Sequence, residues 1–134
     1  MKENITIFIA DDDEDDRQLF IESAREVDKS IKFVTAGDGQ EALRLLKDEH
    51  NPLPDYIFLD LRMPRINGKQ CLEQIEKDER LSHIPVFIYT TSTDVKDAIE
   101  LKKNGAVHFI TKPANPTEIY YILSMVLDEK WGHN

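Results

Sequence analysis

The stretch that most constrains the fold is Tyr56-Ile-Phe-Leu-Asp-Leu-Arg-Met-Pro64, where four consecutive apolar residues lead directly into an aspartate. The apolar run shows no alternation with polar residues, which is typical of a strand buried on both faces. Such strands belong to parallel sheets, which bind ligands at the carboxyl ends of their strands. Asp60 follows the run directly, so we expect a carboxylate at that edge. An ordinary loop aspartate is the alternative, and the rest of the chain decides between them.

Segments with strand-like and helix-like patterns alternate five times along the chain. The predicted strands span residues 5–10, 31–35, 56–59, 84–89 and 107–110. Each strand is followed by apolar residues at helical spacing. In the last helix they are Ile119, Ile122, Leu123, Val126 and Leu127. This alternation predicts an α/β fold with a parallel sheet, right-handed crossovers and helices on both faces.

Helix start and stop signals agree with this alternation. Asp13 can cap a helix, and the acidic residues that follow it are favoured in a first helical turn. We interpret residues 13–16 as helix-start and solvated charges rather than as further ligands. Residues 38–41, Asp-Gly-Gln-Glu, resemble a capping box, and residues 104–105, Asn-Gly, are a stop signal. Residues 115–118, Asn-Pro-Thr-Glu, predict the start of the last helix.

Composition and charge disfavour several classes of protein. The chain has 134 residues, with 40% hydrophobic and 32% charged, which is typical of one globular domain. A net charge of -9 disfavours direct binding to nucleic acid, because phosphate backbones repel it. No apolar run approaches the ~18 residues of a membrane helix, and the first residues lack a signal-peptide pattern. Cys71 is the single cysteine, so we expect no internal disulfide and a reducing, cytoplasmic location.

Polar residues follow four of the five predicted strands. Asp11 and Asp12 follow the first strand, Asp60 the third, Thr90 the fourth and Lys112 the fifth, so they should converge at one edge of the sheet. Three carboxylates so close together repel and need a cation, and oxygen ligands favour a hard ion such as Mg²⁺. A lysine and a hydroxyl beside that ion can bind phosphoryl oxygens, and a carboxylate can accept a phosphoryl group.

Together these motifs make the chain similar to the receiver domain of two-component response regulators. The resemblance rests on Asp11-Asp12, Leu59-Asp60, Met63-Pro64, Thr90 and Lys112-Pro113, in this order. It covers nearly the whole chain. It implies a flavodoxin-like (βα)5 doubly wound parallel sheet with strand order 2-1-3-4-5. It also implies a single receiver domain of the chemotaxis type over residues 1–134, with a core of about 5–130 and no output domain.

The roles of the family's residues carry over to matching positions in this sequence. By this resemblance Asp60 is the phosphoacceptor, and Asp12 and Asp60 are direct ligands of Mg²⁺. Asp11 acts on the ion mainly through water, and the backbone carbonyl of Arg62 completes the metal shell. Arg62 and Ser92 also lie where the family tunes the rate of dephosphorylation.

The resemblance also implies a conformational switch. Thr90 is the hydroxyl that follows the phosphoryl group, and Phe109 matches the aromatic switch position. Lys112 is the lysine that binds phosphate, and its peptide bond to Pro113 is cis in the family. Asn67-Gly68 replaces the commoner Asp-Gly, a departure that a turn tolerates.

These roles describe a signalling protein rather than an enzyme, although the chain would catalyse its own phosphorylation and dephosphorylation. A sensor histidine kinase or a phosphotransfer protein is the expected donor. We expect the output to be a changed surface over the fourth helix, fifth strand and fifth helix, which binds a downstream protein. Three further apolar residues of the last helix lie off its apolar stripe: Tyr120, Tyr121 and Met125. They are either an interaction patch or ordinary surface residues.

Two alternatives stay open at this stage. Asp11-x-Asp13 after an apolar strand also resembles the nucleophile motif of haloacid-dehalogenase-type phosphatases, a family that generally needs a longer chain with a cap and a late acidic pair. The second alternative is a phosphorylation-independent adaptor on a receiver fold, although such degenerate receivers usually lack a site residue. Finding which aspartate is phosphorylated, Asp60 or Asp11, separates the phosphatase from a response regulator.

Overall fold

Strands and helices alternate along residues 4–128, the part of the chain that the structure, a computed structural model, describes. The strands are β1 (Thr6–Ala10), β2 (Lys32–Ala36), β3 (Tyr56–Leu59), β4 (Val86–Thr90) and β5 (His108–Thr111). The helices are α1 (Glu14–Val27), α2 (Gly39–Lys47), α3 (Gly68–Lys77), α4 (Val95–Lys103) and α5 (Thr117–Asp128). The predicted alternation is confirmed, and the predicted core limit at residue 130 lies outside the described residues. Within residues 4–128, no helix has the length and apolar character needed to cross a membrane.

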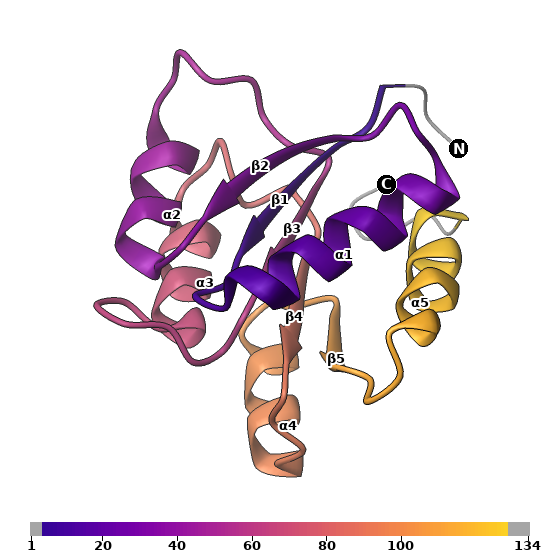
Figure 1. Cartoon of the computed structure of the whole chain (residues 1–134). Coiled ribbons are helices and arrows are strands. Elements are labelled where there is room, and N and C mark those ends of the chain that lie inside the picture. The colour runs from indigo at the N-terminus through magenta and orange to yellow at the C-terminus, as the bar shows by residue number, and fades with distance from the viewer. Residues whose placement is uncertain (1–3, 129–134) are drawn as a thin grey trace.

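The strands form one parallel sheet in the order β2-β1-β3-β4-β5 (Figure 1). This is the predicted flavodoxin-like order. The central strand, β3, pairs with β1 on one side and with β4 on the other. The order of the strands reverses at β1 and β3, where sheets of this kind open a crevice at their carboxyl ends. Asp60 lies at that end of β3.

Helices cover both faces of the sheet, and each face has its own hydrophobic core (Figure 1). α1 and α5 cover one face, where Phe20 and Leu123 are buried. α2, α3 and α4 cover the other, where Leu72 and Leu101 are buried. Phe58 of β3 packs in the first core, while its two chain neighbours pack in the second. Burial on both faces explains why β3 is apolar without alternation.

Side chains cap the starts of three helices at the carboxyl edge of the sheet. Asp13 caps α1 as predicted, since its Oδ1 accepts a hydrogen bond from the Asp16 N–H at 3.0 Å. Asp38 caps α2 in the same way. A complete capping box occurs at α3, where Asn67 and Gln70 exchange side-chain and backbone hydrogen bonds. Asn67 therefore starts a helix in addition to closing the turn before it.

The spacing of Val95, Ala98 and Ile99 predicts a helix here, but two of these three apolar residues do not pack into the core, and Ala98 is half-buried. Val95 and Ile99 are 69% and 64% exposed, and the buried residue of α4 is Leu101. The helix was correctly predicted from their spacing, but α4 joins the core through Leu101. Val95 and Ile99, about one helical turn apart, therefore form an exposed apolar patch on α4.

Gly68, the first residue of α3, lies against the backbone that follows β3. A Cβ atom at this position would come within 2.4 Å of the Asp60 carbonyl oxygen and 2.8 Å of the Leu61 Cα. Both are backbone atoms, which a side-chain rotation cannot move away. The close approach of α3 to the segment that carries Asp60 therefore requires glycine.

We predict that Gly68→Ala lowers the free energy of unfolding by about 1–3 kcal/mol, because the added methyl overpacks the Asp60 backbone. Helix propensity alone would predict a gain, since alanine is favoured over glycine by about 1 kcal/mol. Urea denaturation measures the difference. Gly37→Ala is the matched control, because a Cβ there meets only the Arg17 guanidinium, at 3.8 Å. Equal stability of the two variants would contradict the close approach.

Candidate functional site

Lys112 and the carboxylates that follow β1 and β3 come together at the carboxyl edge of the sheet. The Lys112 Nζ donates to Asp11 Oδ2 at 2.6 Å, to Asp16 Oδ2 at 2.8 Å and to Asp60 Oδ2 at 3.1 Å. The convergence predicted for Asp11, Asp60 and Lys112 is thus observed. Asp16 lies in the first turn of α1 as predicted, but its carboxylate also contacts Lys112, so the interpretation of this side chain as a solvated charge is wrong.

Lys112 reaches the carboxylates because β5 continues beside β4. Its backbone N–H donates to the Thr90 carbonyl at 2.6 Å, and its Nζ lies 5.7 Å from the centre of the Tyr89 ring. The side chain is only 9% exposed. Burial alone lowers the pKa of Lys112, but hydrogen bonds to Asp11 and Asp16 outweigh it, so the pKa lies above its usual range. Lys112 is therefore a permanent cation inside the acidic cluster.

Asp11 is the most deeply buried carboxylate of the cluster. It is 1% exposed, and its Oδ1 accepts a hydrogen bond from the Asp13 N–H at 2.9 Å. Burial raises the pKa of Asp11 to about 6, although the hydrogen bonds from Lys112 and Asp13 oppose the rise. A nearby negative charge on Asp60 raises it further. The cluster thus carries more negative charge than Lys112 can neutralise.

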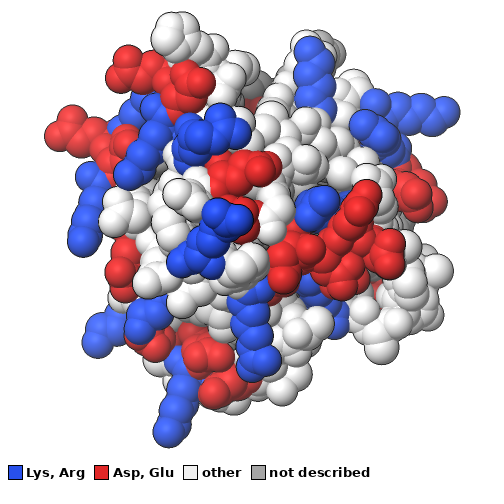
Figure 2. All heavy atoms as spheres, turned by 60° about the vertical axis from the view of Figure 1, so that its left-hand side comes forward, with Lys and Arg blue, Asp and Glu red and all other residues white. Residues whose placement is uncertain are grey.

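The donor set of this cluster fits a divalent cation. Asp11, Asp12 and Asp60 can each place one carboxylate oxygen within 4.8 Å of the others. Asp12 is exposed, so an ion can enter from solvent. Acidic side chains gather near the middle of the face shown in Figure 2, with basic side chains around them. Ligands that are all oxygen suit a hard ion of the size of Mg²⁺.

Arg62 lies two residues beyond Asp60 and contacts it through the backbone. The Arg62 N–H donates to Asp60 Oδ1 at 3.3 Å, while the side chain of Arg62 is exposed. Asp60 is therefore held by Lys112 at one carboxylate oxygen and by a backbone N–H at the other. The role of the Arg62 carbonyl as a metal ligand stays a prediction.

Thr90 and Ser92 connect the site to the start of α4. Thr90 is fully buried, and its Oγ1 accepts a hydrogen bond from the Ser92 N–H at 3.5 Å. The Ser92 hydroxyl donates to Asp97 Oδ2 and accepts from the Asp94 N–H, both at 3.2 Å. The Thr111 hydroxyl donates to the Ser92 carbonyl. The buried hydroxyl of Ser92 is therefore used to hold the β4–α4 loop.

Phe109 is half-buried on β5, opposite Ile88 of β4, and packs against the core beneath α2, α3 and α4. It also lines a groove of about 490 Å³ between β5 and α5, together with Ile122 and Met125. The aromatic ring thus lies between the core near the site and the outer surface of β5. Its role as a switch residue stays a prediction.

Two features of the site differ from the sequence-based expectations. The expected cis bond between Lys112 and Pro113 is wrong, since residues 4–128 contain no cis peptide bond. Tyr89 and Asp16 were missed as neighbours of Lys112. The position of Tyr89 gave a signal, since it precedes Thr90 at the same strand end, whereas Asp16 shares the first turn of α1 with Glu14 and Asp15 and gave none.

Comparison with known protein families agrees with this geometry. A family model described as the response regulator receiver domain matches residues 7–124. A probable transcriptional regulator, ycf27 of Guillardia theta, is 37% identical over 94 residues, which is 70% of this chain and 35% of that protein. The chain therefore spans about a third of the length of this relative.

Comparison with solved structures gives the same result. The phosphorylated cyanobacterial phytochrome response regulator RcpA matches with a TM-score of 0.85 and 30% identity, over 92% of this chain and 91% of that one. The Mn²⁺-bound form of the response regulator Rcp1 matches with a TM-score of 0.79 and 26% identity, over 91% of each chain. Both similarities extend over nearly the whole described fold.

Proposed function

The chain belongs to the response regulator receiver domain family, and on this premise we propose that Asp60 accepts a phosphoryl group from the phosphohistidine of a sensor histidine kinase or phosphotransfer protein. The observation that carries this proposal is the contact of Lys112 with the Asp60 carboxylate at the end of the central strand. The similarity to RcpA, which is solved in its phosphorylated form, supports it. The proposed role of the chain is that of a signalling module of a two-component system, and the proposed location is the cytoplasm.

The proposed transfer uses the Asp60 carboxylate as the nucleophile. A carboxylate oxygen forms a bond to phosphorus while the bond between phosphorus and the donor's imidazole nitrogen breaks, and that nitrogen keeps the electron pair. The Lys112 ammonium, which donates to Asp60 Oδ2 before transfer, can then donate to a phosphoryl oxygen. Lys112 thus provides positive charge where the transferred group brings negative charge.

Mg²⁺ is the ion that we propose for this site. Asp12 and Asp60 would bind it directly, Asp11 mainly through water, and the Arg62 carbonyl would complete its shell. The bound ion supplies positive charge that neutralises the carboxylates and the incoming phosphoryl oxygens. The cluster of Asp11, Asp12 and Asp60 and the Mn²⁺-bound form of Rcp1 support this assignment.

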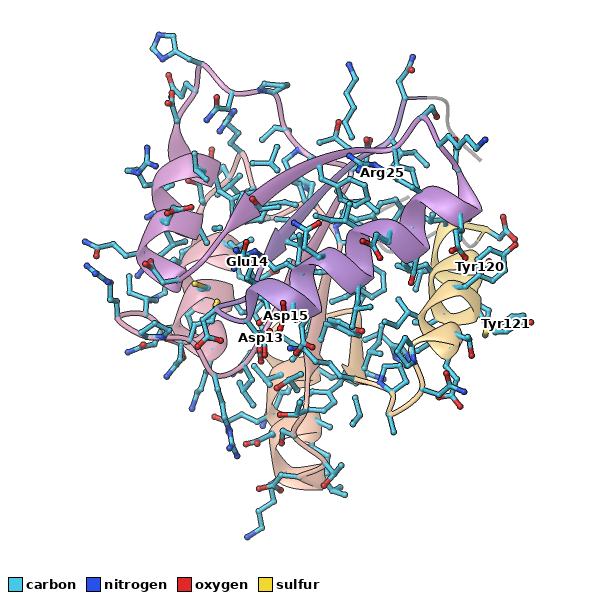
Figure 3. The ribbon with its side chains drawn as sticks, in the orientation of Figure 1. Asp13, Glu14, Asp15, Arg25, Tyr120 and Tyr121 are labelled. Carbon is cyan, nitrogen blue, oxygen red and sulfur yellow. The ribbon has the colours of Figure 1, made fainter. Side chains whose placement is uncertain are left out.

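The output surface that we propose is formed by α4, β5 and α5. Exposed apolar side chains lie on both helices, including Val95 and Ile99 on α4 and Tyr121 and Met125 on α5. Figure 3 shows Tyr121 pointing outward from α5. The groove beside Phe109 lies between β5 and α5. Apolar side chains exposed in this number favour a protein partner.

The proposed switch transmits the phosphoryl charge through Thr90. Movement of the Thr90 hydroxyl toward the phosphoryl oxygens would break its hydrogen bond with Ser92, which holds the start of α4. We expect beryllofluoride, a phosphoryl mimic, to shift amide NMR signals across residues 93–127 of the wild type. In Thr90→Ala the mimic should still bind, with shifts confined to the loops around Asp60.

Thr91→Ala is the matched control for this experiment, because Thr91 is the exposed neighbour of the buried Thr90. It should show the same wide distribution of shifts as the wild type. If Thr90→Ala also transmits the shifts across residues 93–127, the hydroxyl does not carry the signal. If the wild-type shifts stop at the strand ends, the proposed output surface is wrong.

A further inference from the structure

Lys112 is the centre of a hydrogen-bonded cluster in which one carboxylate has no part in the proposed transfer. An ammonium group has three N–H donors, and those of Lys112 are taken by Asp11, Asp16 and Asp60. Asp11 and Asp60 belong to the proposed metal and phosphoryl site. Asp16 comes from α1, and its carboxylate binds Lys112 from the outer side, at 33% exposure.

The contact between Asp16 and Lys112 is held by the position of the helix. Asp13 caps α1 by accepting the backbone N–H of Asp16, which anchors Asp16 in the first turn. The Asp16 side chain then reaches Lys112 Nζ at 2.8 Å, a shorter contact than the 3.1 Å to Asp60. Before transfer, the lysine is therefore at least as closely engaged by Asp16 as by the phosphoacceptor.

A phosphoryl group on Asp60 adds about -1.5 to -2 charge and three acceptor oxygens. The donor that now goes to Asp60 can pass to one of these oxygens. The other two donors stay engaged by Asp11 and Asp16, and Asp16 also adds a negative charge that the phosphoryl group must face. The Lys112 N–H that donates to Asp16 is therefore not available to the phosphoryl group.

We propose that Asp16 is a positioning residue that competes with the phosphoryl group for the Lys112 ammonium, and so weakens the hold of the site on that group. The inference rests on the proposed function, in which Asp60 is the phosphoacceptor. It assigns to α1 a direct influence on the phosphorylated state. Removal of the Asp16 carboxylate therefore strengthens the binding of a phosphoryl group at Asp60.

The test is titration with beryllofluoride at saturating Mg²⁺, followed by amide NMR. Asp16→Asn should lower the dissociation constant for beryllofluoride about three- to tenfold, as expected for a partly exposed charged hydrogen bond. Asp16→Ala, which removes the acceptor altogether, should change it in the same direction. Both substitutions keep the backbone N–H that Asp13 accepts, so α1 keeps its cap.

Asp15→Asn is the matched control. It removes the same charge one residue earlier, from an exposed side chain at the start of α1 (Figure 3). We expect less than a twofold change in the dissociation constant for this variant, and the same Mg²⁺ affinity in Asp15→Asn and Asp16→Asn. If Asp16 had only a structural role, its substitution would change the affinities for beryllofluoride and for Mg²⁺ together. A change in the affinity for beryllofluoride alone therefore supports the competition.

Each outcome of the titration separates the two proposals. If Asp16→Asn binds beryllofluoride no more tightly than Asp15→Asn, or more weakly than the wild type, the competition is overturned while the proposed function stands. If the wild type itself does not bind beryllofluoride in the presence of Mg²⁺, the proposed function fails and the competition fails with it.

Discussion

Asp60→Asn should abolish Mg²⁺-dependent phosphorylation of the protein by acetyl phosphate or by a phosphorylated histidine kinase. An amide has neither the negative charge nor the nucleophilic oxygen of the carboxylate. Asp60 is also the carboxylate that follows the central strand, where Lys112 and the Arg62 N–H hold its two oxygens. Intact-mass measurement of the treated wild type and variant gives the labelled fraction, and peptide mapping gives the labelled residue.

The same experiment separates a response regulator from a phosphatase with Asp11 as the nucleophile. Two observations weigh against that alternative: Asp11 is 1% exposed, and the Asp13 side chain caps α1. Asp15→Asn, which changes an exposed carboxylate outside the cluster, should label like the wild type. Labelling of Asp60→Asn at the peptide that contains Asp11 would show that our assignment of the phosphoacceptor is wrong.

Removal of the divalent cation should have an effect of similar size. With excess EDTA, phosphorylation should fall to background, because Asp11, Asp12 and Asp60 then repel the incoming phosphoryl oxygens. Asp12→Ala removes one proposed ligand and should weaken Mg²⁺ binding at least about tenfold, given the energy of a close pair of charges. Phosphorylation rates across a Mg²⁺ titration measure both effects.

A control variant distinguishes a ligand from a general effect of charge. Asp15→Ala removes an exposed acidic side chain close to Asp12 in the sequence, so it should leave the Mg²⁺ titration nearly unchanged. Mg²⁺ should also raise the melting temperature of the wild type more than that of Asp12→Ala, because binding to the folded state stabilises it. Undiminished phosphorylation in EDTA would rule out the proposed ion.

The fold was predictable because its periodic signals are strong. The uninterrupted run from Tyr56 to Leu59 indicated a central strand buried on both faces. In the structure the side chains of this strand alternate between the two hydrophobic cores. The positions of Asp11, Asp60 and Lys112 after the first, third and fifth strands were enough to bring them together, because parallel strands place their carboxyl ends at one edge. Residue types at strand ends thus carried the prediction of the site.

Other features depend on tertiary geometry that no local pattern carries. The acidic residues at the start of α1 all fit a favourable interaction with the helix dipole, so the pattern did not distinguish Asp16 from Asp15. Only the direction in which α1 crosses the sheet places Asp16 beside Lys112. Likewise, the spacing of Val95 and Ile99 predicted a helix correctly, but how α4 sits on the sheet decides that both are exposed.

The position of β5 at the edge of the sheet has a consequence for folding. Within the described residues β5 pairs with β4 alone, yet the lysine that follows it bonds to carboxylates 101 and 52 positions earlier in the chain. Contacts so distant in sequence close long loops of the chain, which costs more conformational entropy than local contacts do. Local opening of β5 and α5 would move the Lys112 ammonium away from the site and leave Asp11 and Asp60 in place. If Asp60 is phosphorylated as we propose, retention of the phosphoryl group would therefore also report whether β5 is docked on β4.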